Sequence, residues 1–298
     1  SWGCWRSSRS DPSAARRWKN IESGPARALR IGVIALPHMA NFTDFDPLAL
    51  EASISLAFLE RPEEMAGADL LILPGAKQTL DDLGWLEQHG FARELRRLAA
   101  IGVPIAGICG GFQMLGISID DLSGVENHGD PARGKGLGLL PVRSVLRAEK
   151  TVRRVRGALR RDFFGNGSRP PIPFQGYDIH LGETFYETGA RPFADVERRG
   201  ETESVPDGAI SESGRAFGTY VHGPFDRDDL RHAFIRAARA AVALAPAQQW
   251  AHVGAERESR IDRLADHLRA PLDINLLRSW ITAPSSPAAK TRHGWSTS

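Results

Sequence analysis

Short apolar runs alternate with amphipathic stretches in the first half of the chain. Three of these runs are typical of buried β-strands: Arg30–Leu36, Asp69–Pro74 and Val103–Ile108. Between the last two, Trp85–Ala100 carries apolar residues at helical spacing, and Gly102 follows as a stop signal. A strand, a helix and a strand at this spacing predict a parallel sheet with right-handed crossovers. We therefore expect an α/β fold with a mostly parallel, open sheet flanked by helices.

The second half of the chain is richer in strand signals, which are separated by Gly, Pro and polar turns. The predicted strands are Pro141–Leu146, Ile172–Leu181, Phe193–Glu197, Gly208–Ser213 and Ala216–Val221. Helical spacing then returns in an Arg- and Ala-rich amphipathic stretch and in two later segments. These predicted helices are Asp228–Leu244, Glu256–Arg269 and Asp273–Ile281. The fold is thus expected to have a β-rich second half and C-terminal helices.

Composition agrees with one globular domain plus appendages. The chain has 298 residues, of which 42% are hydrophobic and 25% charged, as in ordinary soluble domains. Only two cysteines occur, so no disulfide framework is implied and a reducing cytoplasmic location is expected. No apolar stretch approaches the roughly 20 residues that a membrane helix needs. We therefore expect no membrane partner.

Charge is unevenly distributed, because seven of the Lys and Arg residues fall within the first 30 positions. Such an arm suggests a nucleic-acid tail or a transit peptide, but it lacks a strong amphipathic period, and we expect no nucleic-acid partner. The predicted organisation is a disordered or non-native basic arm at 1–28, a main domain at 29–245, a helical extension at 246–282 and a disordered tail at 283–298.

Cys109 is the first candidate for chemistry. The apolar run before it ends in Ile-Cys-Gly-Gly, and an apolar helix follows at once. Small neighbours permit the strained turn that presents a nucleophile, and the helix N-terminus favours a thiolate. The N–H of Gly110 can point at a developing oxyanion. The alternative is a buried cysteine packed at a strand end, but the flanking glycines favour the nucleophile.

A nucleophilic cysteine needs a base, and His222 is the leading candidate. A short β-rich segment ends in His-Gly-Pro, which places the imidazole at a strand terminus in a loop mouth. His180, in Gly-Tyr-Asp-Ile-His-Leu-Gly, is the competitor. The other histidines lie in polar or helical contexts. Periodicity alone does not choose between His222 and His180.

Six stretches, in order along Arg30 to Ile281, carry a resemblance to a known family. They include Asn41–Leu48, Leu73–Leu86, Ile108–Gly116, Gly176–Thr184, Gly218–Asp226 and Arg260–Leu268. Together they resemble the class I-like glutamine amidotransferase domain of cobyric acid synthase. The resemblance implies a flavodoxin-like parallel sheet with the nucleophile at its carboxyl edge.

The resemblance also implies a role for each matching residue. Cys109 would attack the side-chain amide of glutamine to give a thioester, with His222 as base and then as acid toward the leaving ammonia. The other implied site residues are Gly75 and Gly110 in the oxyanion hole, Gly111 and Gln113 in glutamine binding, and Tyr177 and His180 near the site without a stated role.

One position departs from the wider amidotransferase pattern, in which His-x-Glu supplies a carboxylate that orients the imidazole. Here Pro224 stands two residues beyond His222, as in the cobyric acid synthase branch. The orienting group is therefore unknown, and Asp226 is the nearest carboxylate in sequence. Asp44, within Asn41–Leu48, is interpreted as part of a turn and helix cap. We expect no metal site.

The resemblance implies a partner outside this chain. Cobyric acid synthases resemble a fusion of an N-terminal ATP-dependent domain with this amidotransferase domain. Nothing in residues 1–30 can build that domain, so it is expected to be missing, together with the ATP and Mg²⁺ that it would bind and its substrate, adenosylcobyrinic acid a,c-diamide. The alternatives are the glutaminase subunit of a peptidoglycan (lipid II) amidating complex, or a non-catalytic module that kept the fold.

Overall fold

A computed structural model describes residues 24–160, 163–165, 171–200, 203–269, 271–273, 275–276 and 278–279. The chain divides into two compact units, one ending at Val253 and one beginning at Gly254. Residues just after the predicted boundary at 245 stay with the first unit, because the Ala251 carbonyl accepts a hydrogen bond from Arg231 and its N–H donates to Glu51.

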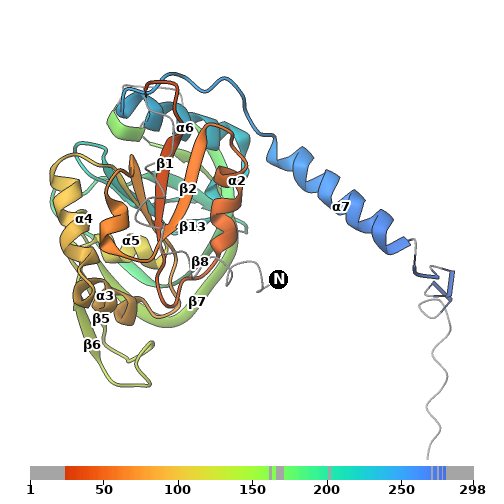
Figure 1. Ribbon diagram of the computed structural model, residues 1–298. Coiled ribbons are helices and arrows are strands. Elements are labelled where there is room, and N and C mark those ends of the chain that lie inside the picture. Colours follow the sequence, from red (N-terminus) through yellow and green to blue (C-terminus); the bar gives the residue numbers. More distant parts are fainter. Residues whose placement is uncertain are drawn as a thin grey trace, which may run out of the picture. The chain divides into compact units, whose positions relative to one another are not determined.

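A six-stranded sheet forms the centre of the first unit (Figure 1). Its strand order is β11-β12-β4-β3-β1-β2, with all neighbours parallel except the β11–β12 edge pair. The strands are β1 Leu29–Ile34, β2 Ile54–Leu59, β3 Leu70–Leu73, β4 Ile105–Ile108, β11 Ala209–Ile210 and β12 Ala216–Thr219. The α/β class with a mostly parallel open sheet is thus confirmed.

Helices cover both faces of this sheet, which is why its central strands are continuous apolar runs. Leu71 and Leu73 of β3 belong to a core that includes apolar residues of three helices, and the alternate residues Leu70 and Ile72 belong to a core that includes residues of α6. The helices of the first core are α3 Thr79–Gln88, α4 Phe91–Ala100 and α5 Gly110–Leu115, while α2 Asp46–Ala49 and α6 Asp228–Ala241 serve the second.

The single helix predicted over Trp85–Ala100 is wrong, because two helices meet there. The first begins earlier, at Thr79, and Gly90, with φ of 82°, separates it from the second. Only glycine adopts this left-handed conformation without steric cost. The apolar spacing continues across the break, since the Trp85 ring stacks on Phe91 with centroids 4.9 Å apart. The apolar spacing along the sequence therefore gives no sign of the break between the two helices.

A second, seven-stranded sheet confirms the β-rich second half. Its path is β10-β9-β7-β5-β6, with β8 paired to β7 and β13 paired to β8. The strands are β5 Ser118–Asp121, β6 Ala132–Lys135, β7 Val142–Leu159, β8 Pro173–Tyr186, β9 Ala194–Arg198, β10 Ser204–Asp207 and β13 Val221–His222. The run predicted at Pro141–Leu146 is only the start of β7, which continues through polar residues in a long antiparallel ladder with β8.

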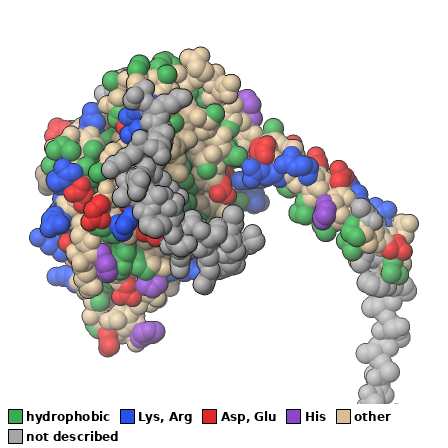
Figure 2. Space-filling view, viewed as in Figure 1, with side chains coloured by type: hydrophobic (Ala, Val, Ile, Leu, Met, Phe, Trp, Pro, Cys, Tyr) green, Lys and Arg blue, Asp and Glu red, His purple; other side chains and the backbone are tan. Residues whose placement is uncertain are grey.

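Helix α7, Val253–Arg269, begins slightly before the predicted Glu256, and all of it after Val253 belongs to the second unit. Figure 2 shows acidic and basic side chains together along α7, and these include the pairs Arg260–Glu256 and Arg269–Asp266. Of the helix predicted at Asp273–Ile281, the described residues 275–276 and 278–279 are helical, and 274, 277 and 280–281 lie outside the described part. Of the arm predicted at 1–28, residues 1–23 lie outside it, as does the tail at 283–298, whereas Arg27 pairs with Asp69. Within the described part of the chain, no helix is both long enough and apolar enough to span a membrane.

Candidate active site

Cys109 occupies the turn between β4 and α5, as the sequence predicts. Its φ of 52° and ψ of −112° lie outside the regions that a non-glycine residue prefers. The turn is held on both sides: the Cys109 N–H donates to the Thr219 carbonyl at 2.8 Å, and its own carbonyl accepts from Gln113 N–H. This strained but well-anchored backbone presents the thiol at the carboxyl edge of the parallel sheet.

The glycines around Cys109 are explained by close backbone approach. A β-carbon at Gly111 would overlap the carbonyl oxygen of Leu73 and lie 2.7 Å from that of Pro74. At Gly110, a β-carbon would come within 3.1 Å of the Ala76 backbone nitrogen. Helix α5 therefore starts against the turn that follows β3. The first N–H groups of a helix have no acceptor within it, and Gly110 is the first residue of α5.

His222 ends strand β13 and is buried, with only 4% of its surface exposed. Its side chain is hydrogen-bonded to that of Cys109. On the opposite side of the ring, Nδ1 lies 2.7 Å from Asp44 Oδ2, while Asp44 Oδ1 accepts the Gly223 N–H at 2.8 Å. A β-carbon at Gly75 would lie 3.0 Å from His222 Cε1. Cysteine, imidazole and carboxylate thus form one hydrogen-bonded line.

The electrostatics of this line favour a charged imidazole. Burial lowers the pKa of His222, but the hydrogen bonds to Asp44 and Cys109 and the Coulombic interactions with both groups outweigh burial and raise it to about 10. His222 is therefore protonated at neutral pH. An imidazolium beside a cysteine sulfur is the pairing that cysteine hydrolases use to hold the nucleophile ready.

Asp44 is the orienting carboxylate that sequence reasoning missed. The interpretation of its segment as a turn is confirmed, since Phe42–Phe45 is a 3₁₀ helix that leads into α2, but the helix-cap part is wrong, because no side chain caps either helix. Asp226, the nearest carboxylate in sequence, lies in the turn after His222, but the Nδ1 atom is taken by Asp44. Asp44 and His222 are 178 positions apart, so only the fold joins them. The one available signal was that Asp44 falls within a family stretch.

Gln113 is buried one helical turn beyond Cys109. Its Nε2 donates to the Leu181 carbonyl at 3.1 Å and to the Tyr220 hydroxyl at 3.3 Å. The Tyr220 hydroxyl is also hydrogen-bonded to Thr184 Oγ1 at 2.6 Å. Burial raises the pKa of Tyr220 to about 12, so its phenol stays protonated. In this structure the Gln113 amide therefore ties α5 to strand β8.

Tyr177 and His180 lie on β8, and the structure brings both close to the site. Tyr177 is the cross-strand partner of His222 and is 45% exposed. His180 is buried: its Nδ1 is hydrogen-bonded to Asp178, and its ring stacks on Tyr220 with centroids 3.9 Å apart. Between them in the chain, the Ile179 carbonyl accepts the Cys109 thiol at 3.4 Å. Strand β8 thus reaches the Cys109 sulfur through the Ile179 carbonyl, with Tyr177 and His180 two residues before and one residue after it.

The carboxylates near Asp44 do not converge. Glu51 is fully buried and pairs with Arg231 at 2.7 Å, whereas Asp44 binds His222. Among the described residues, no group of three or more His, Cys, Asp or Glu side chains is arranged to hold a metal ion.

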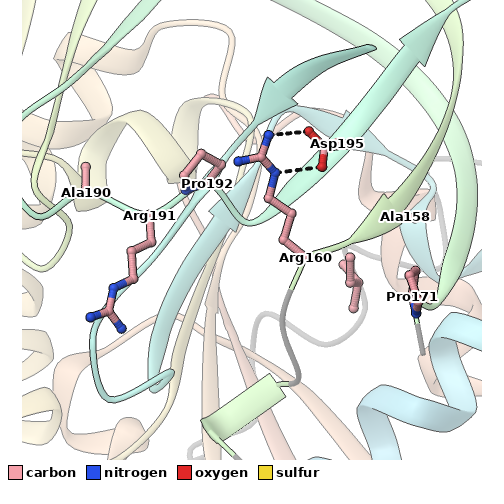
Figure 3. Close-up of a pocket in the computed structure, with 8 residues that line it drawn as sticks. Ala158, Arg160, Pro171, Ala190, Arg191, Pro192 and Asp195 are labelled. Atoms are coloured by element: carbon pink, nitrogen blue, oxygen red, sulfur yellow. Dashed lines mark hydrogen bonds and ion pairs between the residues drawn. The ribbon is translucent and has the colours of Figure 1, made fainter. Parts of the chain in front are cut away.

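A cavity of about 510 Å³ lies away from Cys109, between β7, β9 and the segment at Ala190–Pro192 (Figure 3). Arg160 reaches across it to Asp195, and two of its guanidinium nitrogens are hydrogen-bonded to that carboxylate. None of the residues that line this cavity belongs to the Cys109 site.

A parallel sheet with a cysteine on a strained strand-to-helix turn, paired with a histidine, defines an amidotransferase domain of the class I type. A family profile described as CobB/CobQ-like glutamine amidotransferase domain matches residues 30–230. The chain belongs to this family, and the resemblance inferred from its six stretches is confirmed.

The relatives and a solved structure agree with this assignment. Cobyric acid synthase of Moorella thermoacetica is 39% identical over 90% of this chain and 51% of its own length, and that of Citrobacter koseri is 38% identical over 83% and 48%. This chain thus spans about half the length of the curated relatives that it matches. The structure of PurLQS from Thermotoga maritima shares the fold, with a TM-score of 0.51 and 18% identity over 72% of this chain and 95% of that one.

Proposed function

We propose that this domain hydrolyses glutamine at Cys109 and supplies the ammonia to an ATP-dependent amidation of the cobyric acid synthase type. The observation that carries the proposal is the line Cys109–His222–Asp44, in which a strained cysteine is hydrogen-bonded to a charged, carboxylate-bound imidazole. A structural cysteine at a strand end requires neither partner.

The chemistry follows from that line. The Cys109 sulfur, whose proton is held by His222 as the imidazolium, forms a bond to the side-chain carbonyl carbon of glutamine, and the carbonyl electrons move onto oxygen. The N–H groups at Gly110 and Gly75 stabilise the resulting oxyanion. The imidazolium of His222 then gives its proton to the amide nitrogen, the C–N bond breaks and ammonia leaves. A thioester on Cys109 remains.

Hydrolysis of the thioester uses the same residues in the reverse sense. Neutral His222 takes a proton from water, the hydroxide adds to the thioester carbon, and the C–S bond breaks to release glutamate and restore Cys109. Asp44 keeps the imidazole in one orientation and stabilises its charged form throughout. It would replace the carboxylate that other class I amidotransferases carry two residues after the histidine. Gly111 permits the close approach of α5, and Gln113 would help to hold the substrate.

The acceptor of the ammonia is proposed from the relatives. Both named relatives are cobyric acid synthases about twice the length of the matched region. We therefore assign the synthetase step, with its ATP, Mg²⁺ and adenosylcobyrinic acid a,c-diamide, to a domain or subunit outside this chain, in the cytoplasm. The C-terminal Arg260–Ile281 stretch and Asn41–Leu48 favour this acceptor over a peptidoglycan ligase.

The decisive experiment measures ammonia released from glutamine by the purified chain and by its Cys109→Ser variant, with and without an added ATP-dependent synthetase domain. Release that requires Cys109 and rises with the cobalamin-type synthetase would support both parts of the proposal. Release that rises only with a peptidoglycan synthetase would replace the acceptor. A folded chain that releases no ammonia under any condition would be a non-catalytic module.

A further inference from the structure

The main-chain carbonyl of Ile179 lies 3.4 Å from the Cys109 sulfur and accepts its thiol. Strand β13 pairs with β8 only at Tyr177 and Asp178, through His222 and Val221. Past this point the same edge of β8 faces the nucleophile turn. A strand edge that is not covered by another strand presents main-chain acceptors, and here one of them points at the reacting sulfur.

We propose that the Ile179 carbonyl is the acceptor that recognises the N–H of the substrate carboxamide, and that Asp178 and His180 are the positioning residues that hold it there. The inference rests on the proposed function, because it needs a carboxamide carbon bound at Cys109. When the sulfur joins that carbon, the amide nitrogen lies one bond further on. The carbonyl that accepts the hydrogen bond of the thiol is then within reach of an amide N–H.

This contact distinguishes the substrate from its product. Glutamine offers N–H donors at this point, and the number of N–H groups rises when the nitrogen receives the His222 proton before it leaves. Glutamate would instead place a carboxylate oxygen against the Ile179 carbonyl, with no proton between two acceptors. A site built to bind a donor rejects an analogue that lacks it, because the buried acceptor is left unpaired.

The surroundings of Ile179 are built to keep its carbonyl in place. His180 is bound through Nδ1 to Asp178, and Asp178 also accepts from Arg198 Nε at 3.0 Å. The His180 ring stacks on Tyr220 at an interplanar angle of 18°. Two residues further along the strand, the Leu181 carbonyl is held by Gln113. The residues on both sides of Ile179 are therefore fixed by buried contacts, and none of these contacts uses the Ile179 carbonyl.

The test compares two substrates that differ only in the donor. Glutamine and the γ-methyl ester of glutamate both place a carbonyl carbon at Cys109, but the ester leaves as methanol and has no N–H at that position. We expect His180→Ala to lower kcat/KM for glutamine about tenfold more than kcat/KM for the ester, the loss expected when a charge-assisted hydrogen bond is misplaced. Asp178→Asn, which keeps the side-chain volume, should likewise lower the ratio of kcat/KM for glutamine to kcat/KM for the ester.

Two further variants separate positioning from general damage. His180→Asn keeps an N–H donor toward Asp178 and should keep the ratio closer to that of the wild type than His180→Ala does. Asp195→Asn removes an exposed ion pair with Arg160 on the same sheet and should leave the ratio unchanged.

Equal losses on both substrates in His180→Ala and Asp178→Asn would overturn the inference, and so would a shift of the ratio in Asp195→Asn. If the wild-type chain hydrolyses glutamine through Cys109 but His180→Ala and Asp178→Asn leave the ratio unchanged, the proposed function would stand and this inference would fail. A wild-type chain without hydrolysis dependent on Cys109 would overturn both.

Discussion

Two buried aspartate–histidine pairs lie near Cys109, one through His222 itself and the other through the Ile179 carbonyl between its two members, and they are built differently. In one, Asp44 binds His222 from a 3₁₀ turn far away in the sequence. In the other, Asp178 binds His180 from two positions away on one strand. Only His222 is also hydrogen-bonded to Cys109, whereas His180 stacks on Tyr220.

The difference lies in what each carboxylate neutralises. The Asp44 oxygens bind the His222 ring and the Gly223 N–H, so its charge acts mainly on the imidazole. Asp178 divides its charge between His180 and the guanidinium of Arg198. The Asp44 carboxylate raises the pKa of His222, whereas Asp178 joins His180 to Arg198 of β9. The first pair is thus suited to proton transfer and the second to positioning.

Replacing each histidine in turn by alanine is the strongest test of this comparison. His222→Ala should lower glutaminase kcat by about 10²–10⁴-fold, because a general acid–base group is lost. His180→Ala should cost roughly tenfold. Steady-state ammonia release measures both, with Cys109→Ser as the inactive reference. A His222→Ala variant with wild-type activity beside an inactive His180→Ala would show that the roles are reversed.

Asp44→Asn should lower kcat/KM by roughly a hundredfold, since removing the orienting carboxylate of a catalytic histidine is costly. Because Asp44 raises the pKa of His222, its loss should also move the alkaline limb of the kcat/KM profile from near pH 10 to lower pH. A pH–rate series on both proteins measures the shift. Asp226→Asn is the matched control and should leave the alkaline limb in place.

The two pairs also differ in how far the sequence could predict them. The Cys109 turn is local: an apolar run, a cysteine and two glycines specify it, and the structure has it where the pattern indicates. Asp178 and His180 alternate on one strand, so the β-period places both on the same face. Asp44 meets His222 only because the loop after β1 and the end of β13 reach the same sheet edge, which no local pattern encodes.

The strands and helices also divide into those that the sequence could predict and those that it could not. Fully buried strands such as β3 were predictable from their apolar runs, whereas β6, Ala132–Lys135, contains no such run and forms through its pairing with β5. The break at Gly90 was hidden because Trp85 and Phe91 stack across it. Pairing and stacking over a break are tertiary effects, and periodicity alone does not record them.

Gly75→Ala should disturb one pair and spare the other. The added β-carbon would lie 3.0 Å from His222 Cε1 and 3.7 Å from Cys109 Cβ, so the imidazole must move. We expect a loss of activity of about tenfold or more, since misplacement by less than 1 Å is costly in a preorganised site. Gly84→Ala, in α3 with open space around it, is the control. Equal activity of the two variants would contradict the close approach at Gly75.

The last and smallest effect concerns stability, where the two pairs should respond at opposite ends of the pH scale. The pKa of His222 is raised from 6.5 to about 10, so its pair stabilises the fold fully below pH 6.5 and loses this contribution as pH rises toward 10. Burial favours a higher pKa for Asp178, but His180 and Arg198 outweigh it and lower the pKa below 3.8. That pair therefore stabilises the fold above pH 3.8 and weakens as acid protonates the carboxylate.

Urea unfolding of wild type, Asp44→Asn and Asp178→Asn between pH 3 and 10 measures both contributions. The Asp44→Asn deficit in unfolding free energy, on the order of 1–3 kcal/mol near neutral pH, should shrink toward pH 10, and the Asp178→Asn deficit should shrink toward pH 3. Deficits that stay constant across the range would mean that neither pair is held by its charge.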